Sequence, residues 1–122
     1  MRTFKRSQRI ADQIKRDVSE ILAEMLRDKS ELMVTVSTVE VTDDLAQAKI
    51  FYTVLDDNAE KLKTVKEYFV RATAHIQAEL ARRLRIRRLP EISLHYDKSL
   101  VEGLRMTALI DKVMSEESHE ED

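Results

Sequence analysis

The residues best suited to a chemical role are five arginines that fall within seven consecutive positions. They are Arg82, Arg83, Arg85, Arg87 and Arg88, and no acidic residue lies among them. A guanidinium group can donate two parallel hydrogen bonds to one phosphate, whereas a lysine acts as a point charge. Two arginines would be enough to complement a helix dipole, but five without counter-charges repel one another. The cluster therefore predicts a surface for a polyanion, with nucleic acid as the first candidate.

Other residue types offer little chemistry. The three histidines (His75, His95 and His119) are scattered, and without cysteine they do not favour a zinc site. His95 and Asp97 share a strand phase and could form a hydrogen-bonded surface pair. The acidic pairs at 43–44 and 56–57 fit a turn and a helix cap. A single glycine in the chain excludes a glycine-rich phosphate loop. We therefore expect no catalytic residues, no metal and no cofactor, and a protein that is not an enzyme.

The charge of the chain is unevenly distributed. The 122 residues carry 21 basic and 23 acidic side chains, but five of the acids lie in residues 115–122. Residues 1–114 then hold 21 basic against 18 acidic side chains, a formal charge of +3. We expect one domain over 1–114 and an acidic, disordered tail over 115–122. The absence of cysteine, of a secretory leader and of a long apolar run indicates a soluble, cytoplasmic protein.

Apolar periodicity predicts the elements that must position the arginines. A helix is expected over 6–27, where apolar residues follow the 3.6-residue period. Alternating, β-branched segments predict strands over 32–41, 47–55 and 91–97, and the short connection between the first two favours an antiparallel pair. A second helix should begin after the capping residues 56–58. Residues 100–113 are expected to form a last helix or arm.

The second helical region shows a change of phase. Phe69 and Val70 indicate one apolar face, whereas Ile76, Leu80 and Leu84 form a second stripe. We therefore predict two helices that meet at a kink at Ala72, Thr73 and Ala74, with β-branched Thr73 weakening the helix there. Pro90 should end the second helix, and Arg82 should point away from its apolar stripe.

The predicted order is helix, strand, strand, helix, helix, strand. Such an order makes an α+β domain, with helices on one face of a three-stranded sheet and solvent on the other. Aromatic residues make up only 5% of the chain, and most have core-like positions. Recognition of RNA should therefore depend on phosphates and shape rather than on base stacking.

Three segments of this order resemble the ribosome-binding factor A family of bacterial small-subunit assembly factors. They are the pattern RxxRxxxxI in 6–14, VEVTDDLAQAKIFYTV in 39–54 and IQAELARRLRIRRLPEISLHYDKSLVEG in 76–103. The resemblance implies a type II KH-like fold in which an interrupted helix replaces the GxxG loop. This chain has Ala74 where the family usually has glycine, which favours a shallower interruption.

The resemblance also implies a function. Members of the family bind the free or immature 30S subunit, contact 16S rRNA and assist late maturation and 5′-end processing, above all in the cold. We hypothesise that RNA is bound by Lys5, Arg6, Arg9, Arg71, Arg82, Arg83, Arg85, Arg87 and Arg88. We expect a monomer that has neither a membrane nor a small molecule as partner. A general KH-like RNA-binding module and a protein-interaction adaptor remain as alternatives.

Overall fold

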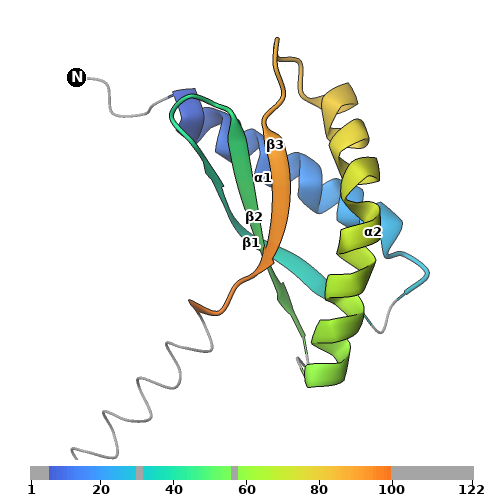
Figure 1. The fold of residues 1–122 in the computed structure, drawn as a ribbon. Coiled ribbons are helices and arrows are strands. Elements are labelled where there is room, and N and C mark those ends of the chain that lie inside the picture. The colour runs from blue at the N-terminus through green and yellow to red at the C-terminus, as the bar shows by residue number, and fades with distance from the viewer. Residues whose placement is uncertain (1–5, 30–31, 56–57, 100–122) are drawn as a thin grey trace, which may run out of the picture.

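The chain forms two helices and one sheet in the computed structural model, which describes residues 6–29, 32–55 and 58–99 (Figure 1). In chain order the elements are α1 (Arg6–Met25), β1 (Val34–Val41), β2 (Gln47–Val54), α2 (Ala59–Arg83) and β3 (Glu91–Tyr96). The expected α+β class is confirmed. Lys5, the arm at 100–113 and the tail at 115–122 lie outside the described residues. Among the described helices, none is long and apolar enough to cross a membrane.

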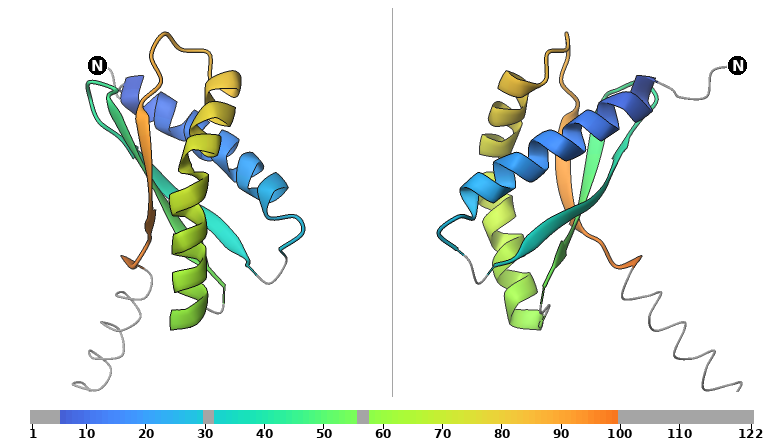
Figure 2. Two further views of the ribbon diagram at one scale, coloured as in Figure 1. Left: turned by 45° about the vertical axis from the view of Figure 1, so that its right-hand side comes forward. Right: turned by 180° about the vertical axis from the view of Figure 1, so that it is seen from behind.

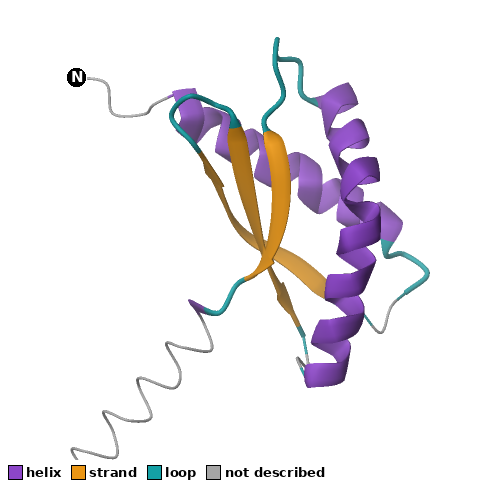
Figure 3. Ribbon diagram, in the orientation of Figure 1, coloured by secondary structure: helices purple, strands orange, loops and turns teal. Residues whose placement is uncertain are grey.

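The sheet has the order β1-β2-β3, with β1 antiparallel and β3 parallel to the central β2. The predicted antiparallel pairing of the first two strands is confirmed. Both helices lie on the same face of the sheet, as the views in Figure 2 show; Figure 3 distinguishes helices from strands by colour. Central strand β2 buries every second residue against them, namely Ala48, Ile50, Tyr52 and Val54. Its other residues face the open side, as its alternation predicts.

Strand β1 contains a bulge that its sequence does not reveal. The pairing with β2 shifts between Val36 and Thr38, so Ser37 is an extra residue. Before the bulge the even-numbered Val34 and Val36 face the helices, and after it the odd-numbered Val39 does so. A regular strand would have placed one of these sets on the solvent face. The bulge therefore allows both apolar phases of β1 to contribute to the core.

Helix α1 supplies the largest apolar contribution to the core. Its inner face buries Ile10, Ile14, Val18, Ile21 and Leu22, in agreement with the predicted period. Burial of each large side chain contributes about 1.5–3 kcal/mol relative to exposure. The helix lies across β1 and also contacts α2, so the first strand and the second helix share one core with it.

Helix α2 runs without interruption from Ala59 to Arg83, so the prediction of two helices meeting at Ala72, Thr73 and Ala74 is wrong. Its buried residues are Val65, Phe69, Ala72, Ile76 and Leu80, which lie on one helical face. The apparent phase change arose from Val70, which is apolar but 75% exposed, and from Ala72, which is buried but too small to stand out as a core residue. The Thr73 hydroxyl donates to the Phe69 carbonyl at 2.6 Å, so this residue is accommodated within the helix.

The start of α2 agrees with the sequence. Asn58 is the N-cap, and its side-chain oxygen accepts a hydrogen bond from the Lys61 N–H at 2.8 Å. This contact satisfies one of the free donors of the first turn. The two aspartates predicted to share in the cap, at 56–57, lie outside the described residues.

Candidate nucleic-acid interface

The arginines after α2 lie on a short connection, residues 84–90, which we call the arginine loop. Helix α2 ends at Arg83, so the predicted helix end at Pro90 is wrong. Leu84 is extended, with φ −96° and ψ 106°, and its N–H donates to the Leu80 carbonyl at 2.8 Å. Leu84 and Ile86 would lie about 200° apart on a continued helix. Because both pack against the core, the chain has to leave the helix.

Apolar residues of the arginine loop anchor it, and its arginines point outward. Leu84 and Pro90 are buried, and Ile86 and Leu89 are partly buried against the core. The side chains between them are exposed, namely those of Arg85, Arg87 and Arg88. Arg85, Arg87 and Arg88 therefore project from a loop and not from a helix that continues to Pro90.

Gln77 of α2 fixes the far end of the arginine loop. Its side-chain amide donates to the Pro90 carbonyl at 2.9 Å and accepts from the Ile92 N–H at 3.0 Å. The amide therefore matches one acceptor and one donor on the segment that enters β3. A loop held in this way loses little conformational entropy when a ligand binds.

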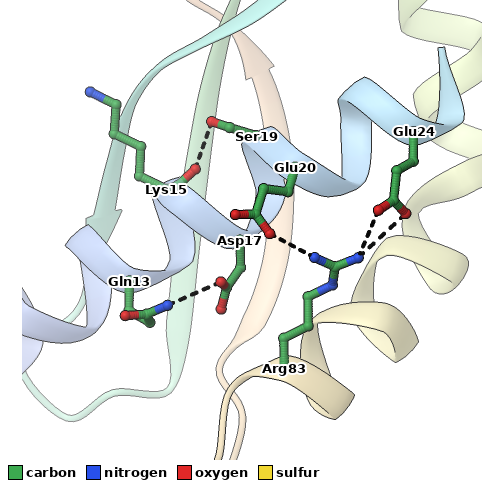
Figure 4. A network of polar contacts seen from close by, with 7 residues as sticks. All are labelled: Gln13, Lys15, Asp17, Ser19, Glu20, Glu24 and Arg83. Atoms are coloured by element: carbon green, nitrogen blue, oxygen red, sulfur yellow. Dashed lines mark hydrogen bonds and ion pairs between the residues drawn. The ribbon is translucent and has the colours of Figure 1, made fainter. Parts of the chain in front are cut away.

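Arg82 and Arg83 differ from the loop arginines because each has acidic partners. Arg83 contacts Glu20 at 2.9 Å and Glu24 at 3.4 Å, both on α1 (Figure 4). Arg82 pairs with Glu79 of its own helix at 2.9 Å, although 74% of its side chain stays exposed. The prediction of five arginines without counter-charges is therefore wrong for these two. No local pattern indicates the partners of Arg83, because they lie far away in the chain.

A second element approaches the arginine loop, the turn between β1 and β2. The Thr42 hydroxyl donates to Asp44 at 2.6 Å, and the Ala46 N–H donates to the same carboxylate at 3.0 Å. These contacts, with the Thr42 bond first, hold the pKa of Asp44 below its ordinary value. The turn also places Leu45 at φ 62°, a left-handed conformation that is costly for leucine.

Two adjoining grooves separate this turn from the arginine loop. One groove, of about 410 Å³, is lined by Arg6, Asp44, Leu45, Ile86, Arg87 and Arg88. The other, of about 550 Å³, is lined by residues 44–47 with Gln77, Arg88, Leu89 and Glu91. Figure 1 shows the start of α1, the β1–β2 turn and the arginine loop at one end of the domain. The fold thus brings together three of the predicted arginines, Arg6, Arg87 and Arg88. It also adds the carboxylates of Asp44 and Glu91, which were not predicted to belong to this site.

The remaining predicted RNA-binding residues are more dispersed. Arg9 is exposed within one turn of Arg6 on α1. Arg71 is exposed in the middle of α2, about 18 Å along the helix axis from its end, at 1.5 Å per residue. Lys5 lies outside the described residues. The structure therefore supports a compact basic end and leaves Arg71 away from it.

The open face of the sheet carries the other predicted polar pair. His95 contacts the Ser93 hydroxyl at 2.9 Å and the Phe51 ring at 5.6 Å between centroids. Asp97 instead accepts from the Ser37 hydroxyl at 2.5 Å, so the predicted pair of His95 with Asp97 is wrong. Among the described residues, no group of three or more acidic or histidine side chains could hold a metal ion.

Comparison with known proteins places the chain in a family. The family model described as Ribosome-binding factor A matches residues 6–110. The chain belongs to the ribosome-binding factor A family. A ribosome-binding factor A from Neisseria meningitidis (serogroup A, strain Z2491) is 38% identical over 120 residues, which cover 98% of this chain and 96% of that relative.

Solved structures of ribosome-binding factor A share the fold. A crystal structure from Thermus thermophilus aligns with a TM-score of 0.59 and 26% identity, over 74% of this chain and 94% of the other. Coordinates of a homology model of the Thermus thermophilus factor, fitted into a cryo-EM map of its complex with the 30S subunit, align with a TM-score of 0.57 and 27% identity. They cover 72% of this chain and 91% of the other.

Proposed function

We propose that this protein is a ribosome assembly factor that binds the free or immature 30S subunit. The observation that carries the proposal is its membership of the ribosome-binding factor A family, together with the 30S complex of a Thermus relative. We further propose that it contacts 16S rRNA and assists late maturation and 5′-end processing, with the greatest effect in the cold. It acts as a monomer in the cytoplasm and is not an enzyme.

The basic end of the domain supports contact with RNA. Arg6, Arg87 and Arg88 line one groove, and Arg85 is exposed beside it. The apolar anchors of the arginine loop hold the guanidinium groups of that loop outward, where they can meet phosphates. Few aromatic rings accompany them, so binding depends on phosphate positions in folded RNA.

Such binding can assist assembly without catalysis. A protein that binds one arrangement of rRNA better than another shifts the population toward the favoured one. Misfolded RNA helices rearrange slowly at low temperature, so this bias has its largest effect there. The factor leaves when the mature subunit no longer offers the preferred arrangement.

Co-sedimentation with purified 30S, 50S and 70S particles tests the proposal. The unchanged protein is expected to pellet with 30S only. Changing Arg85, Arg87 and Arg88 together to Glu should abolish pelleting with the 30S subunit, while the circular dichroism spectrum stays unchanged. The matched control variant carries glutamate in place of Arg27, Lys63 and Lys66. These three residues are exposed and lie outside the basic end, so the control should still bind the 30S subunit. Unimpaired binding of the loop variant would reject the assigned surface.

The salt response separates the alternatives. Affinity for 30S should fall steeply as salt rises, because neutralised phosphates release counterions. Equal affinity for 30S and for random RNA of the same length would favour a general RNA-binding module. Salt-insensitive binding to a ribosomal protein would favour an adaptor. Cleavage of precursor 16S rRNA by the purified protein would contradict the non-enzymatic role.

A further inference from the structure

We propose that Arg83 is a positioning residue that clamps the start of the arginine loop to α1 and does not itself contact RNA. The proposal rests on the proposed function, because the loop it positions is the one assigned to RNA. It removes one residue from the predicted RNA-binding set and gives two acidic residues of α1, Glu20 and Glu24, a role in binding that they exert at a distance.

The geometry of the clamp is that of a fork between two carboxylates. The Arg83 Nη1 atom lies 2.9 Å from Glu20, and its Nη2 atom lies 3.4 Å from both carboxylate oxygens of Glu24. The glutamates are four residues apart on α1, so they share one face of that helix. A planar guanidinium offers a separate nitrogen to each carboxylate, whereas a lysine would have to share one nitrogen between them. Figure 4 shows the Arg83 side chain reaching from the end of α2 to both acids.

The clamp lies at the point of the chain where it can fix the start of the arginine loop. Arg83 is the last residue of α2, and Leu84 is the C-cap. The clamp therefore acts where the chain turns out of the helix, and the Gln77 amide holds the other end of the loop at Pro90 and Ile92. Between these two points the exposed arginines have fixed backbone positions. Loss of either attachment, the Arg83 clamp or the Gln77 hydrogen bonds, should disorder the loop and thereby lower its affinity for RNA.

The local charge argues against a phosphate at Arg83. Its side chain is 26% exposed, and two carboxylates already oppose its single positive charge. Those of Glu20 and Glu24 are 66% and 59% exposed, so a phosphate approaching Arg83 meets a net negative surface. Arg85, Arg87 and Arg88, in contrast, have no ion pair among the described residues.

A charge exchange tests the clamp. All variants carry Glu24→Gln, so that one ion pair remains to be exchanged. In this background Arg83→Glu should weaken 30S binding tenfold or more, because it places an acid against Glu20. Adding Glu20→Arg restores an ion pair of reversed polarity, and the doubly changed protein has the same net charge as the Glu24→Gln background. We expect the double change to bring affinity back to within about threefold of the background.

The Arg82–Glu79 pair provides the matched control. Arg82 is mostly exposed and belongs to the RNA-binding residues predicted from the sequence, so exchanging it with Glu79 should not restore binding. The slope of affinity against salt gives a second readout, because each phosphate contact contributes about 0.7 to 0.9 to it. Arg83→Glu should lower the slope by more than one contact, and the exchange should return it.

The outcomes separate the clamp from the proposed function. If the exchange leaves binding weak and the slope lower by a single contact, Arg83 touches RNA and the clamp is rejected. If the unchanged protein does not pellet with 30S, the proposed function fails. The clamp is then judged by amide exchange at Ile86, whose N–H donates to the Leu84 carbonyl at 3.1 Å. Arg83→Gln, of similar length, should accelerate this exchange without unfolding the protein; unchanged exchange would reject the clamp.

Discussion

Ser37 donates a hydrogen bond to Asp97 at 2.5 Å, which connects β1 with the end of β3 although β2 lies between the two strands. The same hydroxyl lies 3.2 Å from the Phe51 carbonyl of β2. A bulge residue thus links all three strands on the open face of the sheet. This relationship has a consequence for the pH dependence of stability.

The Ser37 hydroxyl is the main reason that the pKa of Asp97 lies below its ordinary value of 3.8, with further hydrogen bonds from Ser99. Because the folded-state pKa is depressed, the contribution is present above about pH 4 and is lost as pH falls through the depressed pKa. Ser37→Ala should cost about 1 kcal/mol at pH 7. Its Tm difference from the unchanged protein should shrink below pH 4. In an Asp97→Asn background the difference should not depend on pH; a persistent dependence would contradict this linkage.

Gln77 is expected to be the most sensitive polar residue of α2. Gln77→Met preserves the length of the side chain but removes both hydrogen bonds to the segment entering β3. It leaves the Pro90 carbonyl and the Ile92 N–H without their partner, which should cost about 2–3 kcal/mol in chemical unfolding. Gln77→Glu keeps the acceptor for Ile92 but sets a carboxylate oxygen against the Pro90 carbonyl. Its loss relative to the unchanged protein should therefore shrink at low pH, where the protonated carboxyl can donate. A loss that does not depend on pH would show that packing, rather than the paired hydrogen bonds, makes this residue important.

The continuity of α2 predicts the effect of glycine at position 74. Ala74 is exposed in the helix interior, so Ala74→Gly should lower the free energy of unfolding by about 1 kcal/mol. Ala78 is also exposed on α2, and Ala78→Gly serves as the control. The two changes should cost the same. A neutral or stabilising effect at 74 alone would indicate that the helix prefers to break there after all.

Asp17 is a buried acid on α1, with 7% of the residue exposed. Its Oδ1 atom accepts from Gln13 at 3.0 Å, whereas its Oδ2 atom is buried and has no hydrogen-bond partner among the residues that the structure describes. Burial of an incompletely paired carboxylate is costly, more so than burial of a neutral amide. Asp17→Asn should therefore raise the free energy of unfolding by about 1 kcal/mol. Exposed Asp12→Asn should change it little, and a destabilised Asp17→Asn would show that the charge is compensated.

Local pattern was sufficient for much of this fold. The alternation of β2 and the helical period of α1 predicted their buried faces, because each element has one polar and one apolar side. Helix α2 was harder to predict, since Ala72 is too small to stand out as a core residue and Val70 looks like one. The bulge at Ser37 has no local signature, because both phases of β1 carry apolar residues.

Only the part of the candidate site that is local in the chain could be predicted. The arginines of the loop are adjacent in the chain, so composition alone found them. The partners of Arg83 and the carboxylates of Asp44 and Glu91 come from other elements, and only the fold brings them near. Counter-charges that arrive through tertiary structure cannot be read from a run of like charges.

The bulge at Ser37 also bears on how sequences of this family can vary in length. Removing that one residue would give a regular ladder in which Val36 and Val39 still face the helices and Thr38 still faces solvent. A one-residue gap is therefore tolerated by both faces of the sheet at this position, whereas a gap elsewhere in β1 would turn its apolar side chains outward. A relative that lacks the residue would keep the core, and it would lose the hydroxyl that ties the three strands together.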